Sequence, residues 1–333
     1  MLNLFRQNTA FAASMLVVFA LLLRVPIFVW PHAYNYIETA PLSKTIFTFL
    51  KAAPNHLLLS NILALILLVF QALFINYIVV QHSILYKDTF LPGLFFVAIN
   101  CIYPEQSELT PQLISNTFIL LMFQRLCFLY ESSNPLLLVL DAGMYLGLAL
   151  LFNYDVAVFL PYILISVIIF TSFNFRYLAV SVIGIFTPLY FAAVIYYLSN
   201  DLEEIIAFIG QSFERKLLGA VSSGYHLYLP AIIIVPILLI STLKLQFNFF
   251  SNKVKTRRIL QSMLLLFFFG VLGLIIENVN FIYALFYLSI PISIVIAYYF
   301  ISDKKLLMKE LLFFAIIGFG VYYNIIRPLF LVY

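Results

Sequence analysis

Charged residues are scarce in this sequence of 333 residues, in which Asp, Glu, Lys and Arg together make up 10%. A soluble domain carries roughly 25% charged residues, because its surface has to be solvated. Hydrophobic residues make up 64% of the chain, and they recur in runs near the ~20 residues that a bilayer-spanning helix needs. A water-soluble globular protein is therefore excluded, and the sequence predicts a polytopic membrane protein.

Several motifs that carry chemistry in other proteins are also missing. The sequence has no Gly-rich phosphate loop and no HExxH, CxxC or serine-nucleophile motif. It has only two cysteines, Cys101 and Cys127, which fall near opposite ends of neighbouring apolar runs. We expect no disulfide between them and interpret both as packing residues. Membrane lipids are the expected partners, and no nucleic acid is expected.

Eleven apolar runs are candidate membrane spans, and neither a repeat nor a low-complexity linker separates them. The predicted fold class is an all-α polytopic bundle of about eleven transmembrane helices, forming a single integral membrane domain over residues 1–333. The third and fifth runs are short, so each could tilt differently, break or re-enter. The runs are 10–30, 57–80, 89–103, 112–130, 136–152, 156–173, 177–198, 229–247, 259–277, 281–300 and 311–331.

The loops predict the orientation of the bundle. The densest basic segments, 252–258 and 302–310, are separated by two spans and are both expected in the cytoplasm. This arrangement places the N-terminus inside and the C-terminus outside, with twelve of the 18 Lys and Arg residues on or toward the cytoplasmic side. The outer loops are then 31–55, 104–111 and 199–228. Two of these loops, 31–55 and 199–228, contain amphipathic segments that predict helices lying in the membrane interface.

The first interfacial helix is expected to start after Ser43 as N-cap and to have Ile46, Phe49, Leu50 and Ala53 on one face. The second is expected to start at Asn200 and to end near Gly219. Each of these helices could cover the rim of the bundle, or form a lid or wall beside a lipid-exposed groove.

Ionisable residues within apolar spans are costly, at roughly 2.5–3.5 kcal/mol each near the centre of the bilayer. Arg24 lies toward the outer end of its span, where its side chain could snorkel to the surface. Arg125 and Asp141 lie toward the cytoplasmic ends of neighbouring spans, and we interpret them as an ion pair between two helices. Glu277 ends the ninth span and is expected to be solvated.

The outer side collects carboxylates and groups that can bind phosphate. A carboxylate can act as a general base or hold a divalent metal, and Arg or His can bind a lipid phosphate. Solvated loop charges would give the same composition, so both interpretations stay open. The carboxylates are Glu38, Glu105 and Glu108, and the cations or potential cations are Arg24, His32, Lys44, Lys51, His56, Arg215 and His226.

Three stretches resemble the multispanning GT-C glycosyltransferases, which use polyprenyl-phosphate-linked sugars. They are "LLLRVP" before a long outer loop, the hairpin "LPGLFFVAINCIYPEQSELTPQLISNTFILLMFQRL", and "DAGMYLGLALLFNYDVAVFLPYILI". The whole chain also resembles an uncharacterised family of bacterial inner-membrane proteins. This resemblance implies a location in the bacterial inner membrane.

The GT-C resemblance implies a transferase acting on the extracytoplasmic side. Members of that class carry a functional Asp, or an Asp/Glu pair, in the first outer loop, where this chain has only Glu38. The resemblance thus implies that Glu38 is the base, supported by Glu105 or Glu108, which could also hold a divalent metal. Phosphate contacts would come from Arg24, His32, Arg215 and His226. The alternatives are a non-enzymatic subunit or scaffold of an envelope machine, and a transporter.

Overall fold

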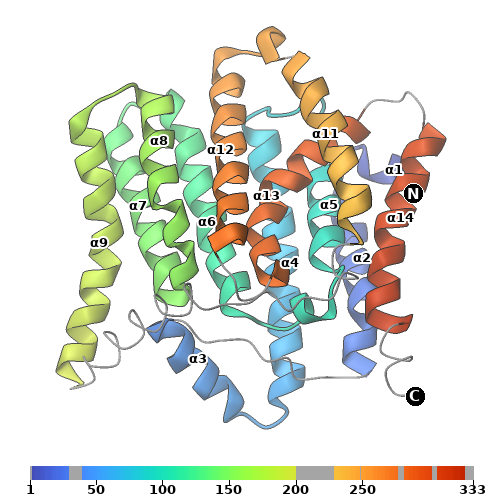
Figure 1. The fold of residues 1–333 in the computed structure, drawn as a ribbon, viewed down its shortest axis with the longest axis horizontal. Coiled ribbons are helices and arrows are strands. Elements are labelled where there is room, and N and C mark those ends of the chain that lie inside the picture. Colours follow the sequence, from blue (N-terminus) through green and yellow to red (C-terminus); the bar gives the residue numbers. More distant parts are fainter. Residues whose placement is uncertain are drawn as a thin grey trace.

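The computed structural model describes residues 2–29, 40–199, 229–247, 249–276, 281–301 and 306–326. In these ranges the chain folds into helices joined by short connections and contains no β-strand (Figure 1). The helices are α1 (Leu2–Phe5), α2 (Ala10–Val29), α3 (Pro41–Lys51), α4 (His56–Gln81), α5 (Leu91–Asn100), α6 (Pro111–Phe128), α7 (Pro135–Phe152), α8 (Leu160–Thr171), α9 (Phe175–Leu198), α11 (Ala231–Phe247), α12 (Val254–Ile276), α13 (Phe281–Phe300) and α14 (Leu306–Val321).

The described residues include nine helices that are long and apolar enough to cross a membrane. The chain is therefore a multi-pass membrane protein with an all-helical fold. The expected count of about eleven spans is not confirmed, because the runs 89–103 and 229–247 form shorter helices, α5 and α11. The fifth run forms the 18-residue helix α7, whereas the third, α5, has only ten residues.

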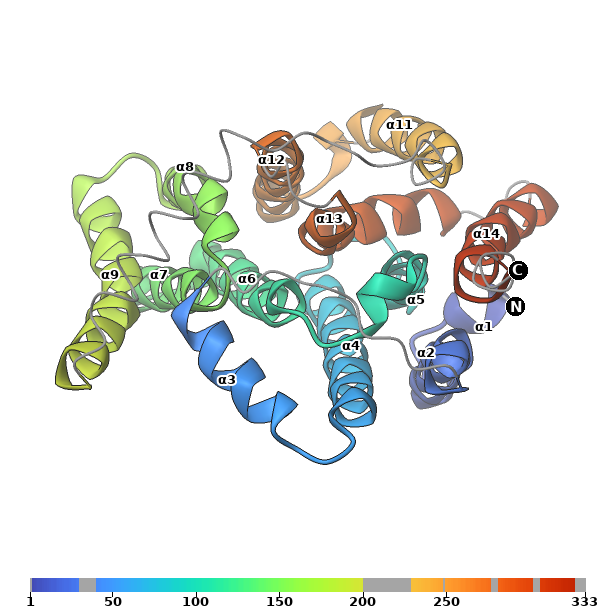
Figure 2. The same cartoon turned by 60° about the horizontal axis from the view of Figure 1, so that its bottom comes forward.

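The centre of the bundle is formed by α13 and α5. In α13, 89% of the apolar window is buried, and all ten residues of α5 are buried. Helices α4, α6, α11 and α12 pack near this pair, while α7, α8 and α9 extend the bundle to one side (Figures 1 and 2). Helix α3 lies across one end of the bundle, which we call the α3 end.

Asn76 on α4 and Gly93 on α5 allow these two helices to pack closely. The first backbone N–H groups of any helix lack partners within it, and in α5 the N–H of Gly93 donates to Oδ1 of Asn76 on α4, at 3.0 Å. A Cβ at position 93 would lie 2.7 Å from the backbone oxygen of Ala72. Glycine at this position therefore allows the close approach of α5 to α4.

Helices α7 and α9 pack through small residues. Gly143 and Gly147 are four residues apart on α7, a spacing that lets membrane helices approach closely. A Cβ at Gly147 would lie 2.3 Å from the backbone oxygen of Ile185, and one at Gly143 would lie 3.0 Å from Cα of Gly184. This contact fixes α9 at the edge of the bundle.

The predicted ion pair between Arg125 and Asp141 is confirmed. Nε of Arg125 on α6 lies 3.5 Å from Oδ2 of Asp141 on α7, and both side chains are partly buried. The pair links adjacent helices near the end opposite α3. Cys101 and Cys127 are both buried free thiols, as the sequence predicts.

The helix expected after Ser43 differs in start and face. It begins at Pro41, and Ser43 lies inside its first turn, where its hydroxyl donates to the backbone oxygen of Ala40 at 2.6 Å. The buried residues are Pro41, Ser43, Phe47 and Leu50, whereas Phe49 is 83% exposed. Leu50 of the predicted apolar face is thus buried together with Phe47, which the prediction did not include, and Ala53 lies beyond the end of the helix.

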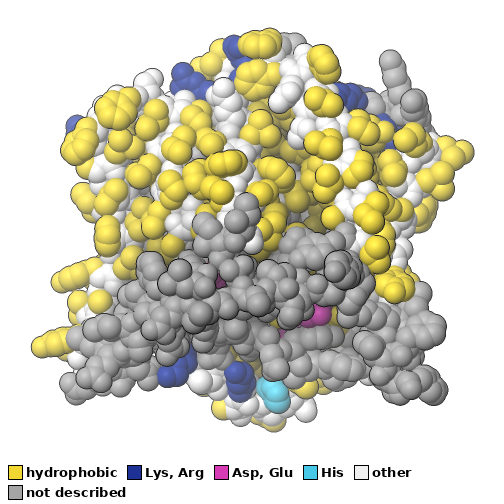
Figure 3. All heavy atoms as spheres, viewed as in Figure 1, with side chains coloured by type: hydrophobic (Ala, Val, Ile, Leu, Met, Phe, Trp, Pro, Cys, Tyr) yellow, Lys and Arg dark blue, Asp and Glu magenta, His cyan; other side chains and the backbone are white. Residues whose placement is uncertain are grey.

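One face of the bundle is largely apolar between its ends. Figure 3 shows hydrophobic side chains over most of the face, with Lys and Arg gathered near the ends of the bundle. Such a belt is expected where lipid tails replace water. The interfacial helix predicted over 200–219, like Glu277, lies outside the described residues.

Replacing Gly147 by Ala should weaken the α7–α9 contact, because the new methyl group meets the backbone of Ile185. Overpacking of this kind costs about 1–3 kcal/mol, so the midpoint of thermal unfolding in detergent should fall by several degrees. Gly273→Ala is the matched control, since nothing lies within 4 Å of a Cβ at that position. Equal midpoints for the two variants would contradict the packing described here.

A second prediction concerns His82, which follows α4 and is 2% exposed with its ring 4.5 Å from that of Phe128. Burial, and then the charge of Lys255, lower its pKa to about 4, against a smaller opposing effect of Glu131. Between pH 6.5 and about pH 4, the unfolded chain therefore binds a proton at His82 and the folded chain does not. The free energy of unfolding falls over this range as the pH decreases.

His82→Leu should remove this contribution and reduce the loss of thermal stability between pH 7.5 and pH 5. His56→Leu, at an exposed position at the start of α4, is the control and should keep the wild-type dependence. An unchanged pH dependence in His82→Leu would show that His82 is not the responsible group.

Candidate functional site

The segment 101–110, which joins α5 to α6, carries Glu105 and Glu108 and is folded into the bundle. Eight of its ten residues are buried, and Glu108 is only 4% exposed. Its middle, Pro104–Ser107, is a single 3-10 turn. The solvated-loop interpretation is therefore wrong for Glu108, whose side chain is enclosed by protein.

Arg24 on α2 holds this loop directly. Its Nη1 donates to the backbone oxygen of Ser107 and its Nη2 to that of Gln106, both at 3.1 Å. The side chain is 1% exposed. Snorkelling of Arg24 to the surface is thus wrong, because the two carbonyl groups between Glu105 and Glu108 bind the guanidinium within the bundle.

Three further helices hold the loop. Ser60 on α4 accepts a hydrogen bond from the backbone N–H of Leu109 at 3.1 Å, and Nε2 of Gln106 donates to the backbone oxygen of Ile282 on α13 at 3.0 Å. After α14, Nδ2 of Asn324 donates to the backbone oxygens of Cys101 and Ile102, at 3.0 and 3.3 Å. The loop is therefore fixed by side chains from several directions.

The loop lies inside the bundle rather than above it. Arg24 is five residues before the last residue of α2, which places it about 7.5 Å along the helix from that end. Ser60 is four residues after the first residue of α4, about 6 Å from that end. Irregular backbone at such a depth is tolerated in membrane proteins where protein groups satisfy it.

A polar seam continues from the loop into the bundle between α4, α6 and α13. The hydroxyl of Tyr287 lies 2.9 Å from Oγ of Ser115 and accepts from Nδ2 of Asn153 at 2.7 Å. Nε2 of Gln71 donates to Oγ1 of Thr117 at 2.7 Å, and Nδ2 of Asn116 donates to Oε1 of Gln71 at 3.3 Å. These contacts bring polar groups from distant parts of the sequence together.

Several amide groups near the loop have buried atoms without a hydrogen-bond partner in the described part of the chain. They are both side-chain polar atoms of Asn61 and the side-chain oxygens of Gln106, Gln112 and Asn116. Gln106 is on the loop, Gln112 is in the first turn of α6, and Asn61 follows the Ser60 that holds Leu109. Leaving such a group unsatisfied costs about 1–3 kcal/mol, so a ligand with hydroxyl groups would gain by satisfying them.

The structure thus brings three of the seven predicted site residues together at loop 101–110. Arg24 contacts the backbone of the segment that carries Glu105 and Glu108. The other four, Glu38, His32, Arg215 and His226, lie outside the described residues, and their roles stay predictions. Among the described residues no group of three or more His, Cys, Asp or Glu side chains could hold a metal ion. A divalent ion on Glu105 and Glu108 would need further oxygen ligands, such as carbonyl or phosphate groups.

Sequence reasoning missed the amide and hydroxyl residues of the site. It considered only ionisable residues within spans, whereas Asn324 holds the loop, Gln71 belongs to the seam, and Asn61 and Gln112 are buried near the loop. Amides are also infrequent in apolar helices and hydrogen-bond across helices. Their recurrence on α4 and at the start of α6 is the signal that could have identified them.

Comparison with known proteins gives one match. A family model, described as a family of unknown function (DUF6427), matches residues 42–329. No curated protein and no solved structure matches the chain. The matched range includes the loop and its partners on α4, α13 and α14, while Arg24 on α2 precedes it.

Arg24→Lys should destabilise the protein, because one ammonium group cannot reproduce two parallel bonds to neighbouring carbonyl groups. A buried carbonyl left unsatisfied costs about 1–3 kcal/mol, which should appear as a lower midpoint of thermal unfolding in detergent. The control is Arg176→Lys, at an exposed position in the first turn of α9. Equal stability of Arg24→Lys and the wild type would contradict the proposed role of the guanidinium.

Proposed function

The chain belongs to DUF6427, a family of unknown function, and we propose that it is a GT-C-like membrane glycosyltransferase. In this proposal it takes a sugar linked to polyprenyl phosphate and transfers it at the α3 end of the bundle. That end faces the extracytoplasmic side of a bacterial inner membrane, with the N-terminus in the cytoplasm and the C-terminus outside. The distribution of Lys and Arg between the loops supports this orientation.

One observation carries the proposal: the carboxylate-bearing loop 101–110 is buried and fixed in place. A loop with only a connecting role would leave its charges in water, because burying a carboxylate is costly. Here Arg24 and Gln106 hold the backbone between Glu105 and Glu108 from two sides. Ionisable residues at membrane depth are functional candidates, and fixed carboxylates suit catalysis because no reorganisation is needed when charge develops.

The surroundings of the loop support a carbohydrate substrate. Among the described residues, the amide atoms of Asn61, Gln106 and Gln112 that have no hydrogen-bond partner include both acceptors and a donor. Sugar hydroxyl groups both donate and accept, so a sugar could satisfy these amides. A purely apolar ligand would leave them buried and unpaired.

The proposed step is a displacement at the anomeric carbon. A general base removes the proton of the acceptor hydroxyl, the new glycosidic C–O bond forms, and the bond to the phosphate oxygen breaks, so that polyprenyl phosphate leaves. Glu38 is the proposed base, with Glu105 and Glu108 as supporting carboxylates or as ligands of a divalent metal. His32, Arg215 and His226 are proposed to bind the phosphate.

Arg24 has a positioning role in this proposal. Its two terminal nitrogens are engaged by the carbonyl oxygens of Gln106 and Ser107. A direct contact with phosphate would require the guanidinium to leave these carbonyl oxygens. We therefore propose that Arg24 positions the loop and does not bind the lipid.

A non-enzymatic subunit is a second candidate, and the exposure of α9 favours it. Only 17% of the apolar window of α9 is buried, against 89% in α13. Phe186, Tyr190 and Phe191 are each more than 60% exposed on this helix. A membrane partner could cover this surface, and a stable, defined partner that copurifies with an inactive protein would support that candidate.

The glycosyltransferase proposal is tested with Glu105→Gln and Glu108→Gln in proteoliposomes. The readout is the release of polyprenyl phosphate from a radiolabelled polyprenyl-phosphate-linked sugar. Loss of a supporting carboxylate should reduce turnover by roughly 10²-fold or more in at least one variant. The amide keeps the size of the side chain, so the midpoint of thermal unfolding should change little.

Glu131→Gln is the matched control. Glu131 is paired with Lys255 at 2.8 Å, beyond the end of α6 that is remote from the loop, and its replacement should leave turnover unchanged. Wild-type turnover in both Glu105→Gln and Glu108→Gln would remove these carboxylates from the mechanism. A wild-type protein that turns over no such lipid would remove the function.

A further inference from the structure

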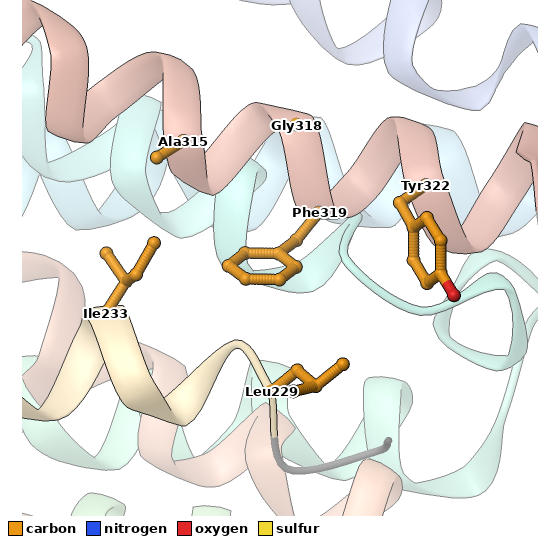
Figure 4. Close-up of a pocket in the computed structure, with 6 residues that line it drawn as sticks. All are labelled: Leu229, Ile233, Ala315, Gly318, Phe319 and Tyr322. Carbon is orange, nitrogen blue, oxygen red and sulfur yellow. The ribbon is translucent and has the colours of Figure 1, made fainter.

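A hollow of about 340 Å³ lies between α11 and α14. In Figure 4, Phe319 and Tyr322 project from α14 toward the start of α11, where Leu229 and Ile233 face them. Leu229 and Tyr322 are 38% and 39% exposed, so the hollow is open at the surface of the bundle. It is lined by Leu229, Ile233, Ala315, Gly318, Phe319 and Tyr322.

The apolar lining of the hollow favours a hydrocarbon ligand. The phenolic hydroxyl of Tyr322 is the only polar side-chain group among the six lining residues. Two small residues, Ala315 and Gly318, shape the wall, and nothing lies within 4 Å of a Cβ built at Gly318. Water does not fill an apolar hollow of this kind, and α14 is among the membrane-spanning candidates.

The size of the hollow favours a single hydrocarbon chain as its ligand. On α14 the lining extends from Ala315 to Tyr322, seven residues or about 10.5 Å. A spanning partner helix would need a groove near 30 Å long and about 10 Å wide. The hollow is thus long enough for a segment of one hydrocarbon tail but not for a spanning helix.

Helix α14 and the residues directly after it contact both the hollow and the candidate site. A Cβ at Gly320 would lie 3.2 Å from the backbone oxygen of Cys101, and the ring of Tyr323 is 5.1 Å from that of Tyr103. Asn324 donates to the backbone oxygens of Cys101 and Ile102. The residues directly after Tyr322 thus contact the start of the loop that carries Glu105.

We infer that this hollow binds the tail of a single-chain phosphate lipid, with the polar end of the lipid directed from Tyr322 toward loop 101–110. The inference rests on the proposed function, since it assigns the lipid part of the same substrate. It adds a site, the α11–α14 hollow, and residues that determine the fit of the tail, Ala315 and Gly318.

The test uses tryptophan fluorescence, because the chain has a single tryptophan, Trp30. In a Trp30→Phe background, Phe319→Trp places a reporter in the hollow. Phe314→Trp places one on the same helix at a position 51% exposed to the surroundings. Proteoliposomes are titrated with dibromostearyl phosphate, whose bromine atoms quench tryptophan on contact.

A tail bound in the hollow should quench the reporter of Phe319→Trp at a mole fraction about fivefold lower than that of Phe314→Trp, a preference of roughly 1 kcal/mol. Gly318→Leu fills the hollow and should abolish the preference. Gly273→Leu is the control, since its Cβ also meets nothing within 4 Å but it does not line the hollow. Equal quenching of the two reporters would show that the indole in the hollow meets only bulk lipid and would overturn the inference.

Turnover separates this inference from the proposed function. Preferential quenching without any release of polyprenyl phosphate would leave the lipid site standing and remove the transferase activity. Turnover together with equal quenching of the two reporters would support the transferase activity and remove the lipid site. If both hold, Gly318→Leu should lower turnover at limiting lipid and recover it at higher lipid, whereas Glu105→Gln should keep the quenching preference.

Discussion

The bond between Arg24 and the two carbonyl groups of Gln106 and Ser107 is the interaction on which the site depends. A bilayer offers no water to unpaired backbone groups, so an irregular loop at membrane depth needs protein donors. Placing an arginine in a membrane helix costs roughly 2.5–3.5 kcal/mol. Two charge-assisted hydrogen bonds, at about 1.5–3 kcal/mol each, offset that cost. The charge and the loop therefore stabilise each other.

This arrangement also sets where chemistry can occur. Arg24, Ser60 and Asn324 satisfy backbone groups of loop 101–110, and they thereby fix the segment that carries Glu105 and Glu108. The short helix α5 ends inside the bundle and so brings the loop between α2, α4, α13 and α14. The residues directly after Tyr322, which lines the proposed lipid site, contact the start of the same loop. The same loop thus carries the two carboxylates, is held by hydrogen bonds to its backbone, and contacts the residues next to the proposed lipid site.

Sequence patterns predicted the parts of this fold that depend on local apolar length. The runs of about 20 residues gave the spanning helices, and the charges of Arg125 and Asp141 on successive spans gave their ion pair. The start of α3 was missed by three residues, and the burial of Phe47 was not predicted because it depends on tertiary contacts. The count of about eleven spans was not confirmed, because α5 and α11 are shorter than the other apolar helices.

The candidate site was only partly predictable for a similar reason. The sequence identified Glu105, Glu108 and Arg24 by their charge, but it did not predict that Arg24 binds the backbone of the loop. Arg24 binds two residues, Gln106 and Ser107, that lie 82 and 83 positions later in the chain, and no local pattern reveals such a contact. Asn61 and Gln112 gave no ionisable signal, and their importance comes from burial next to the loop.

Hydrogen–deuterium exchange of the wild-type protein in lipid nanodiscs tests the central claim most directly. If loop 101–110 is enclosed and bonded as described, its amides, including that of Leu109, should exchange as slowly as those in the first turns of α6. Exchange of these amides at the rate of a solvent-exposed connection such as 132–134 would contradict the account.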